Sequence, residues 1–193
     1  MQKASLDAIA KYGNGTKGRY GEGARGGEMA QHICASLSLS HPGLMTDCSN
    51  PEWVFNNAGG AMGSMWIIHG SLSEYVIVFG SNQPIPTSHT GRYRYADDYF
   101  TILSGEQVGT FEKPGEISFF GPGSQHHLPA GAGGAYSCPD HCWALEYARG
   151  FIPSMLPFGF ADTFSSTLDF YTLWRTIYLY GVEIIGQLAR GKL

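Results

Sequence analysis

The chain has 193 residues, a formal net charge of -4, 15% charged residues and 13% aromatic residues. That length predicts one domain with a real core, and the composition excludes a disordered chain, which needs many charges and few aromatics. The acidic balance excludes a general nucleic-acid binder, which needs a basic face. Few charges and many aromatics indicate a large apolar cavity, a membrane surface, or both.

Residues 1–50 are predicted to form a helical, glycine-rich N-terminal segment. Within it, residues 5–12 and 28–39 predict two short helices. Residues 13–27 combine many glycines with charged side chains, a composition that predicts a flexible loop. No run of 18 uncharged apolar residues occurs in the sequence, so no segment is predicted to span a bilayer as a helix.

Residues 51–150 consist of short apolar runs separated by Gly/Pro turns, a texture typical of an all-β barrel or sandwich. A Pro-Gly turn and a Pro-x-Gly turn flank the strand in residues 113–127, which resembles the second half of a cupin barrel. Metal-binding cupins also carry a His-x-His motif, but His69 and His89 stand alone here, so we expect no metal site. The clearest predicted strands are residues 65–69, 74–79, 99–103, 116–120 and 141–148.

Residues 151–193 are predicted to form two apolar, amphipathic C-terminal helices. Pro157 should bend or restart the first helix. Ser166 with Asp169 resembles a capping box, which predicts that the second helix begins near Thr167. Most of the second helix is apolar or aromatic, as in helices that lie in a membrane interface or cap an apolar barrel; an ordinary buried helix is the alternative. Its narrow polar stripe contains Asp169, Glu183 and Arg190.

The cysteines are not spaced like a disulfide framework, and a chain of this length needs no such staples. The spacing of Cys34, Cys48, Cys138 and Cys142 therefore predicts no disulfide framework, and free buried thiols are the expected state of Cys138 and Cys142. Two alternatives stay open for Cys138 and Cys142. One is a redox disulfide, and the other is a zinc site that adds the nearby histidines His126, His127 and His141.

Several ordered blocks of the sequence resemble the fungal sterol C-8 isomerase family, whose animal relative is the sigma non-opioid receptor. These blocks are residues 54–65, 71–76, 79–80, 89–93, 145–154, 161–164 and 166–170. The resemblance implies a cupin-like β-barrel with a closed apolar interior, capped by two C-terminal helices that lie against the endoplasmic reticulum membrane. It also implies a homotrimer without a cofactor. Family members usually begin with a transmembrane helix, so a lost anchor and a reliance on the C-terminal helices are both open.

Isomerase members of this family move the ring double bond of a sterol from the 8 to the 7 position. Shifting an isolated alkene needs an acid, a pocket that tolerates a cation and a base, and two carboxyl groups in an apolar cavity suffice. Glu146 is the first candidate, as the proton donor, and in the resemblance it falls on the family's essential glutamate. Its side of the predicted strand leaves room for a bulky ligand because it carries small side chains, namely Cys142, Ala144 and Ala148.

The second carboxyl group is expected from Asp97 or Asp98, which precede the predicted strand 99–103. Alternation places Asp98 on the same side as Ala96, Phe100 and Ile102, and the resemblance puts the paired acid on this strand. We therefore choose Asp98 as the base or as the counter-ion of the cation. The alternative is that either aspartate only caps a turn.

A further set of apolar and aromatic residues is expected to line the sterol pocket. Tyr75 and Tyr147 can each line it or simply pack, Glu74 is expected to make structural hydrogen bonds, and His69 is expected to bond a backbone group. Trp66 and Trp143 are expected to pack in the core. The predicted substrate-binding residues are Met62, Met65, Tyr75, Ile77, Phe79, Phe100, Ile152 and Met155.

Two functions follow from this pocket. The first is a sterol C-8 isomerase of ergosterol-type biosynthesis in the endoplasmic reticulum membrane. The second is a non-catalytic, sigma-receptor-like binder of amphiphilic amines or sterols, since an ammonium group mimics the carbocation beside the carboxylates. Asn56, Asn57 and residues 96–100 look more like the isomerase members of the family than like the receptor, and this resemblance favours the enzyme. The expected partners are a sterol, cationic amphiphilic amines as inhibitors, a membrane surface and further copies of the chain.

Overall fold

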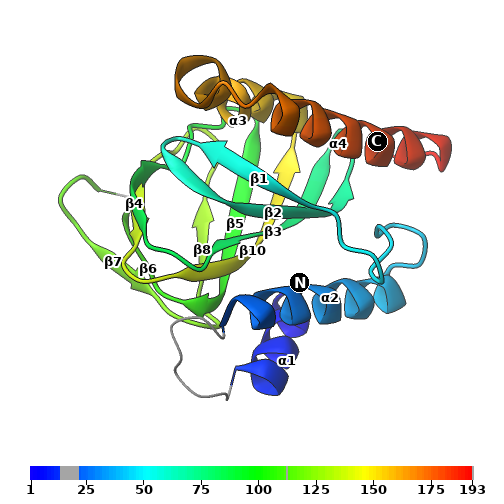
Figure 1. Cartoon of the computed structure of the whole chain (residues 1–193), viewed down its shortest axis with the longest axis horizontal. Helices are drawn as coiled ribbons and strands as arrows, with labels where there is room; N and C mark the ends of the chain where they lie inside the picture. Colours follow the sequence, from blue (N-terminus) through cyan, green and yellow to red (C-terminus); the bar gives the residue numbers. More distant parts are fainter. Residues whose placement is uncertain (14–21, 112, 193) are drawn as a thin grey trace.

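The computed structural model describes residues 1–13, 22–111 and 113–192. Figure 1 shows a β core with two N-terminal helices, α1 (Gln2–Tyr12) and α2 (Glu22–Ser40), on one side. The C-terminal helices α3 (Leu156–Asp162) and α4 (Phe170–Ala189) cross the opposite side of the core. The predicted β segment between two helical segments is therefore confirmed. The helices contain about as many residues as the strands, so the fold is mixed α and β rather than mainly β.

The core consists of two antiparallel sheets. The larger sheet has the strand order β1-β2-β3-β10-β5-β8, and the smaller has the order β4-β9-β6-β7. Side chains from both sheets border one cavity, so the sheets face each other across the interior. The strands are β1 (Trp53–Ala58), β2 (Ala61–Gly70), β3 (Glu74–Ser81), β4 (Ile85–His89), β5 (Ala96–Gly105), β6 (Gln107–Thr110), β7 (Ser118–Phe120), β8 (Gln125–Leu128), β9 (Ala135–Cys138) and β10 (Cys142–Gly150).

The strand register places the inward side chains of the larger sheet in rungs. Glu146 of β10 pairs with Ile77 of β3 on one side and with Phe100 of β5 on the other. Phe100 in turn pairs with His126 of β8. Because side chains alternate across a strand, every second residue returns to this face. The next inward rung contains Tyr75, Ala148, Asp98 and Leu128.

The other face of the larger sheet packs against α1 and α2. Burying one large apolar side chain contributes about 1.5–3 kcal/mol, and both faces of the central strands gain in this way. This is why residues 75–79 form a continuous apolar run instead of alternating with polar residues. The shared core contains Trp66, Ile68, Val76, Val78, Leu103 and Leu145 from the sheet and Met29, Ile33 and Leu37 from α2.

The predicted elements of the N-terminal half and the core are largely confirmed. Both helices and all five strands form, although the strand expected at residues 116–120 is only Ser118–Phe120. The flexible loop predicted at residues 13–27 is wrong from Glu22 onward, because α2 begins there. Residues 14–21 of that loop lie outside the described residues.

The C-terminal segment confirms one expected helix boundary and corrects another. Pro157 lies in the first turn of α3, where proline is tolerated, so the predicted restart is confirmed. The predicted capping box is wrong, since Asp169 is itself the N-cap of α4 and its Oδ1 accepts a hydrogen bond from Thr172 N at 3.0 Å. Leu168, with a left-handed φ of 53°, ends the preceding π-helical turn and delays the start of α4.

The expectation of free buried thiols at Cys138 and Cys142 is wrong, and the structure shows the alternative of a disulfide between them. The structure joins Cys34 of α2 to Cys48 of the following loop, and Cys138 of β9 to Cys142 of β10. The folded chain brings the Cα atoms of each pair to 5.6 Å and 5.9 Å, a separation that a disulfide bridges. Sequence spacing does not reveal this proximity.

The helices of the described residues are too short or too polar to be candidates for crossing a membrane.

Candidate active site

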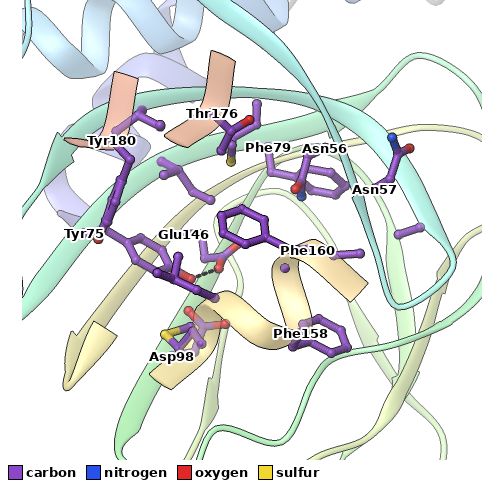
Figure 2. A pocket seen from close by; sticks show the side chains of 18 of the residues that line it. Asn56, Asn57, Tyr75, Phe79, Asp98, Glu146, Phe158, Phe160, Thr176 and Tyr180 are labelled. Atoms are coloured by element: carbon purple, nitrogen blue, oxygen red, sulfur yellow. Dashed lines mark hydrogen bonds between the residues drawn. The ribbon is translucent and has the colours of Figure 1, made fainter. Parts of the chain in front are cut away.

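A cavity of about 350 Å³ lies between the two sheets, with α3 and α4 along one side. Its volume falls in the range of small-molecule sites, which are mostly apolar with a few placed polar groups. Figure 2 shows Asp98, Glu146 and Tyr75 together on the wall formed by the larger sheet. The helices contribute the facing side chains labelled in the same view, namely Phe158, Phe160, Thr176 and Tyr180.

Glu146 projects from β10 into this cavity. Its inward neighbours on the strand, Ala144 and Ala148, are small and fully buried, which leaves space for a ligand beside the carboxyl group. The Tyr75 hydroxyl donates a hydrogen bond to Glu146 Oε1 (Figure 2). Burial raises the pKa of Glu146 to about 7, and the hydrogen bond from Tyr75 acts in the opposite direction.

Asp98 is the second carboxyl group of the cavity. It is a diagonal neighbour of Glu146 on the adjacent strand β5, a spacing of roughly 7–8 Å. Burial raises its pKa well above the ordinary value, and the nearby charge of Glu146 raises it further. Asp98 Oδ1 has no hydrogen-bond partner among the described residues. The raised pKa values favour a proton on the pair, and the hydrogen bond from Tyr75 to Glu146 favours placing that proton on Asp98.

Two more phenols, Tyr93 and Tyr136, border the cavity near the acids. Burial raises the pKa of both hydroxyl groups, and the charges of Glu146 and Asp98 add to the effect. Both side chains are therefore uncharged hydrogen-bond donors. Surrounding the acids with uncharged groups keeps the local dielectric low, which strengthens any interaction between a carboxylate and a cation.

The structure brings seven of the eight predicted substrate-binding residues to the cavity, and Met62 is the exception. Ala61, Met65 and Ile67 share the inward face of β2, whereas Met62 lies on the opposite face and is 60% exposed. The prediction for Met62 is therefore wrong by one position of strand alternation. The cavity is bordered by Met65, Tyr75, Ile77, Phe79, Phe100, Ile152 and Met155.

Several lining residues are missing from the sequence-based prediction. One group comes from one face of α4. An i, i+3/i+4, i+7 spacing indicates that its residues share a face, but it does not show which part of the protein that face contacts. The other group comes from the sheet strands beyond β5. These residues are Leu173, Thr176, Tyr180 and Ile184 of α4, Gln107 of β6, His126 of β8 and Tyr136 of β9.

The residues of the alternative zinc site are not brought together. Cys138 and Cys142 are bonded to each other, His126 lines the cavity, and His127 on the outer face bonds Asp97. Within the part of the chain that the structure describes, no group of three or more His, Cys, Asp or Glu side chains is placed to hold a metal ion.

Residues expected to have structural roles do have them. His69 Nδ1 lies 2.7 Å from Leu44 O, and Glu74 accepts a hydrogen bond from the Tyr147 hydroxyl at 2.9 Å. Tyr147 packs against the core on the outer face of the sheet and does not border the cavity. Two tryptophans pack in the core between the sheet and α2, namely Trp66 and Trp143.

Residues 1–192 match the family model for ERG2 and Sigma1 receptor like proteins. A C-8 sterol isomerase from Pyricularia oryzae is 47% identical over all of this chain and 81% of its own length. A C-8 sterol isomerase from Aspergillus fumigatus is 48% identical over all of this chain and 75% of its own length. A sigma non-opioid intracellular receptor 1 from Xenopus tropicalis is 42% identical over 79% of this chain and 68% of its own length.

Solved structures with a partial likeness include an RmlC-like cupin from Shewanella frigidimarina, with a TM-score of 0.46 and 11% identity over 55% of this chain and 89% of that one. KdgF from Halomonas has a TM-score of 0.45 and 12% identity, over 55% of this chain and 94% of that one.

Proposed function

This chain belongs to the family of ERG2 and Sigma1 receptor like proteins, and on that premise we propose that it is a C-8 sterol isomerase. Its relatives near 48% identity carry that activity in their names. The observation that supports the chemistry is the pair of carboxyl groups in one apolar cavity, the buried Asp98 and the half-buried Glu146. The reaction moves the ring double bond of a sterol from the 8 to the 7 position.

The reaction starts with a proton from a carboxylic acid. Asp98 has the pKa that burial raises well above the ordinary value, and it lacks a described partner for Oδ1, so it is the donor to one alkene carbon. On sequence grounds Glu146 is expected to be the donor. The hydrogen bond from Tyr75 stabilises the ionised form of Glu146, which favours the opposite order.

Protonation leaves a tertiary carbocation on the other alkene carbon. The Glu146 carboxylate stabilises this cation, by about 4 kcal/mol at ~4 Å and an effective dielectric of ~20. Glu146 then removes a proton from the carbon on the far side of the cation, which forms the new double bond. After turnover Glu146 carries the proton and Asp98 is ionised; Glu146 then releases a proton to water and Asp98 takes one from water, which restores the starting state.

The experiment that tests this function follows an 8-ene sterol in detergent micelles with the purified protein, in water and in D₂O. We expect conversion to the 7-ene isomer, with one deuterium at the protonated carbon. A 7-ene product without deuterium would contradict protonation by an exchangeable carboxyl group. If the protein binds the sterol but converts none of it, the chain is a non-catalytic binder of sterols or amphiphilic amines.

We also propose that cationic amphiphilic amines bind in the same cavity as inhibitors. The ammonium group replaces the carbocation beside the Glu146 carboxylate, and the apolar walls take the hydrocarbon. Competition of an amine with sterol turnover tests this, and no effect of a saturating amine on turnover would contradict it.

The outer face of α4 supports a further proposal, that the C-terminal helices lie on a membrane surface. Their polar groups turn toward the protein: Arg190 Nη1 donates to Gly43 O at 2.6 Å, and the half-buried Glu183 bonds Thr46. The opposite side is apolar and fits an interfacial helix. It exposes Phe164, Leu168, Phe170, Tyr171, Trp174, Tyr178, Val182, Ile185 and Leu188.

Liposome flotation tests this membrane contact. Replacing Trp174 and Ile185 together by serine should reduce flotation, because each loses about 1.5–3 kcal/mol of apolar burial. The matched control is Leu39→Ser on α2, a residue that is 85% exposed on the other side of the molecule. Equal flotation of both variants would contradict the proposed face.

The homotrimer and the location in the endoplasmic reticulum membrane are proposals of the same kind. Exposed apolar side chains outside α3 and α4 suit a subunit interface; they include Phe55, Met62, Ile117 and Phe119. Sedimentation in mild detergent tests the trimer, and a monomer at micromolar concentration would contradict it. Co-localisation with an endoplasmic reticulum marker tests the location.

A further inference from the structure

Two polar side chains of the cavity have no role in the proton transfers described above. Gln107 and His126 are 1% and 9% exposed and both border the cavity. Within the described residues, Gln107 Oε1 and His126 Nδ1 have no hydrogen-bond partner. Buried polar groups in native proteins are hydrogen-bonded in the great majority of cases. We therefore expect Gln107 Oε1 and His126 Nδ1 to bond a polar group of water or of a ligand.

The two side chains belong to one neighbourhood. Gln107 pairs in register with Phe120, whose ring centroid lies 5.2 Å from that of His126. His126 is also stacked on Phe111 at 4.2 Å. These aromatic contacts fix the imidazole in place, and Gln107 lies beside Phe120, so both polar side chains belong to the β6–β8 end of the cavity.

Both side chains are uncharged and suit a hydroxyl group. Burial and, to a smaller extent, the neighbouring His127 lower the pKa of His126 to about 4, so the imidazole has one donor and one acceptor nitrogen at neutral pH. The amide of Gln107 also offers a donor and an acceptor. A hydroxyl group needs that combination, whereas a carboxylate or a phosphate would find no positive charge at these two residues.

Their position relative to the acids also fits a sterol. His126 is separated from Glu146 by one strand within the same rung, about 10 Å between backbones. In a sterol, rigid fused rings hold the 3-hydroxyl group at a fixed distance from the ring double bond. The cavity side formed by α3 and α4 is mainly apolar and suits the alkyl side chain.

We infer that Gln107 and His126 form the subsite that binds the 3-hydroxyl group of the sterol and so set its direction in the cavity. This inference rests on the proposed function. The hydroxyl-bearing ring points to the β6–β8 end, the double bond lies beside Asp98 and Glu146, and the side chain points to α3 and α4. When the sterol binds in this direction, the ring carbons that gain and lose a proton lie beside the two carboxyl groups.

The test compares an 8-ene sterol with its 3-deoxy analogue, by binding and by turnover, in four proteins. These are the wild type, Gln107→Met, His126→Phe and the control His127→Phe, which changes the same side-chain chemistry on the outer face of the same strand. Methionine and phenylalanine keep the bulk and the aromatic packing but remove the polar atoms. The preference for the hydroxyl ligand is the readout, because a general defect of a variant affects both ligands equally.

We expect the wild type and His127→Phe to prefer the hydroxyl sterol by at least about tenfold, because a site built to bond a hydroxyl group rejects an analogue without it. Gln107→Met and His126→Phe should each reduce that preference about fivefold. An unchanged preference in both variants, or none in the wild type, would overturn the subsite. If the wild type converts neither sterol, the proposed function fails, and the binding preference in the same four proteins still decides the subsite.

Discussion

The two faces of the six-stranded sheet carry the same kinds of polar side chain in opposite environments. On the outer face, Asp97 accepts hydrogen bonds at 3.1 Å from the backbone N–H of Ala130 and from His127, and these bonds lower its pKa. On the cavity face, Asp98 follows directly in the sequence, and burial raises its pKa. The pKa values of adjacent aspartates thus shift in opposite directions because strand alternation places the two side chains on opposite sides of the sheet.

The glutamates repeat this contrast. Both accept a hydrogen bond from a tyrosine hydroxyl, Glu74 from Tyr147 and Glu146 from Tyr75. Burial raises the pKa of Glu74, but the hydrogen bonds from Lys192 and Tyr147 outweigh it, so its pKa is lowered. Glu146 has no such ammonium partner among the described residues, and burial prevails. The chemistry of these carboxyl groups is therefore set by their partners, not by residue type.

The strongest test of the difference between the two faces is to replace the carboxyl groups of each face in turn. Glu146→Gln and Asp98→Asn keep size and hydrogen bonding but cannot exchange the proton, so turnover should fall by about 10²–10⁴-fold. Conversion of an 8-ene to a 7-ene sterol by the purified variants is the measurement. Glu146→Gln should also weaken an amine inhibitor, because it removes the carboxylate beside the ammonium group, whereas Asp98→Asn replaces an uncharged acid and should affect the amine less.

Asp97→Asn is the matched control, and we expect near-wild-type turnover because Asp97 faces away from the cavity. Thermal melts verify that each variant is folded. An inactive Asp97→Asn beside an active Asp98→Asn would contradict the assigned register. Normal turnover in Glu146→Gln would remove the mechanism altogether.

The pH dependence of turnover tests the ionisation of the two carboxyl groups on the cavity face. With Asp98 as the donor and Glu146 as the base, kcat/KM should fall as the pH drops through about 7, where Glu146 becomes protonated, by about tenfold per pH unit. The opposite order, with Glu146 as the donor, needs the same singly protonated pair and predicts the same fall, so the profile tests whether one ionised carboxyl group is required. A kcat/KM that stays level below that value would contradict this requirement.

The sequence predicted the cavity face of the strands well because period-2 alternation is a local property. It placed Glu146 and Asp98 on inward positions, and the register confirms that they share a face. Met62 is the exception because it lies on the outward side of that alternation, one position from the inward Ala61. Local patterns cannot show which surface a helix covers, so Thr176 and Tyr180 of α4 could not be placed at the cavity beforehand.

The contacts that the sequence could not predict join residues that are far apart in the chain. Tyr75 and Glu146 are separated by 71 positions in the chain, and only the pairing of β3 with β10 brings them together. The same holds for Cys34 and Cys48, whose approach depends on how the loop after α2 returns. Periodicity therefore predicted the faces of the strands, whereas tertiary structure determined which groups meet across them.

Removing one tyrosine from each face should have a smaller effect. Tyr75→Phe deletes the hydrogen bond that favours ionised Glu146, so the pKa of Glu146 should rise. The acidic limb of the pH profile should then shift to higher pH, with about fivefold lower turnover near neutral pH. The control Tyr147→Phe deletes the bond to Glu74 on the outer face and should leave the profile in place. A Tyr75→Phe profile that coincides with the wild type would show that this hydroxyl does not tune Glu146.

The smallest expected effect concerns stability. In the folded chain the pKa of Asp98 is raised above its unfolded value of ~3.9, so stability is lost as the pH rises from that value toward the folded one. Asp98→Asn removes this loss and should raise the melting temperature at neutral pH, by about 2–4 °C for each kcal/mol gained.

The pKa of Asp97 is lowered in the folded chain, so its contribution is present at neutral pH and disappears as the pH falls through the folded value. Asp97→Asn should therefore lower stability at neutral pH, by no more than about 1 kcal/mol for so exposed a group. Melting curves at neutral pH and below about pH 4, where the Asp98 effect should vanish because both states are protonated, are the measurement. A lower melting temperature for Asp98→Asn at neutral pH would mean that Asp98 is a stabilised carboxylate, and the two faces would then not differ as described.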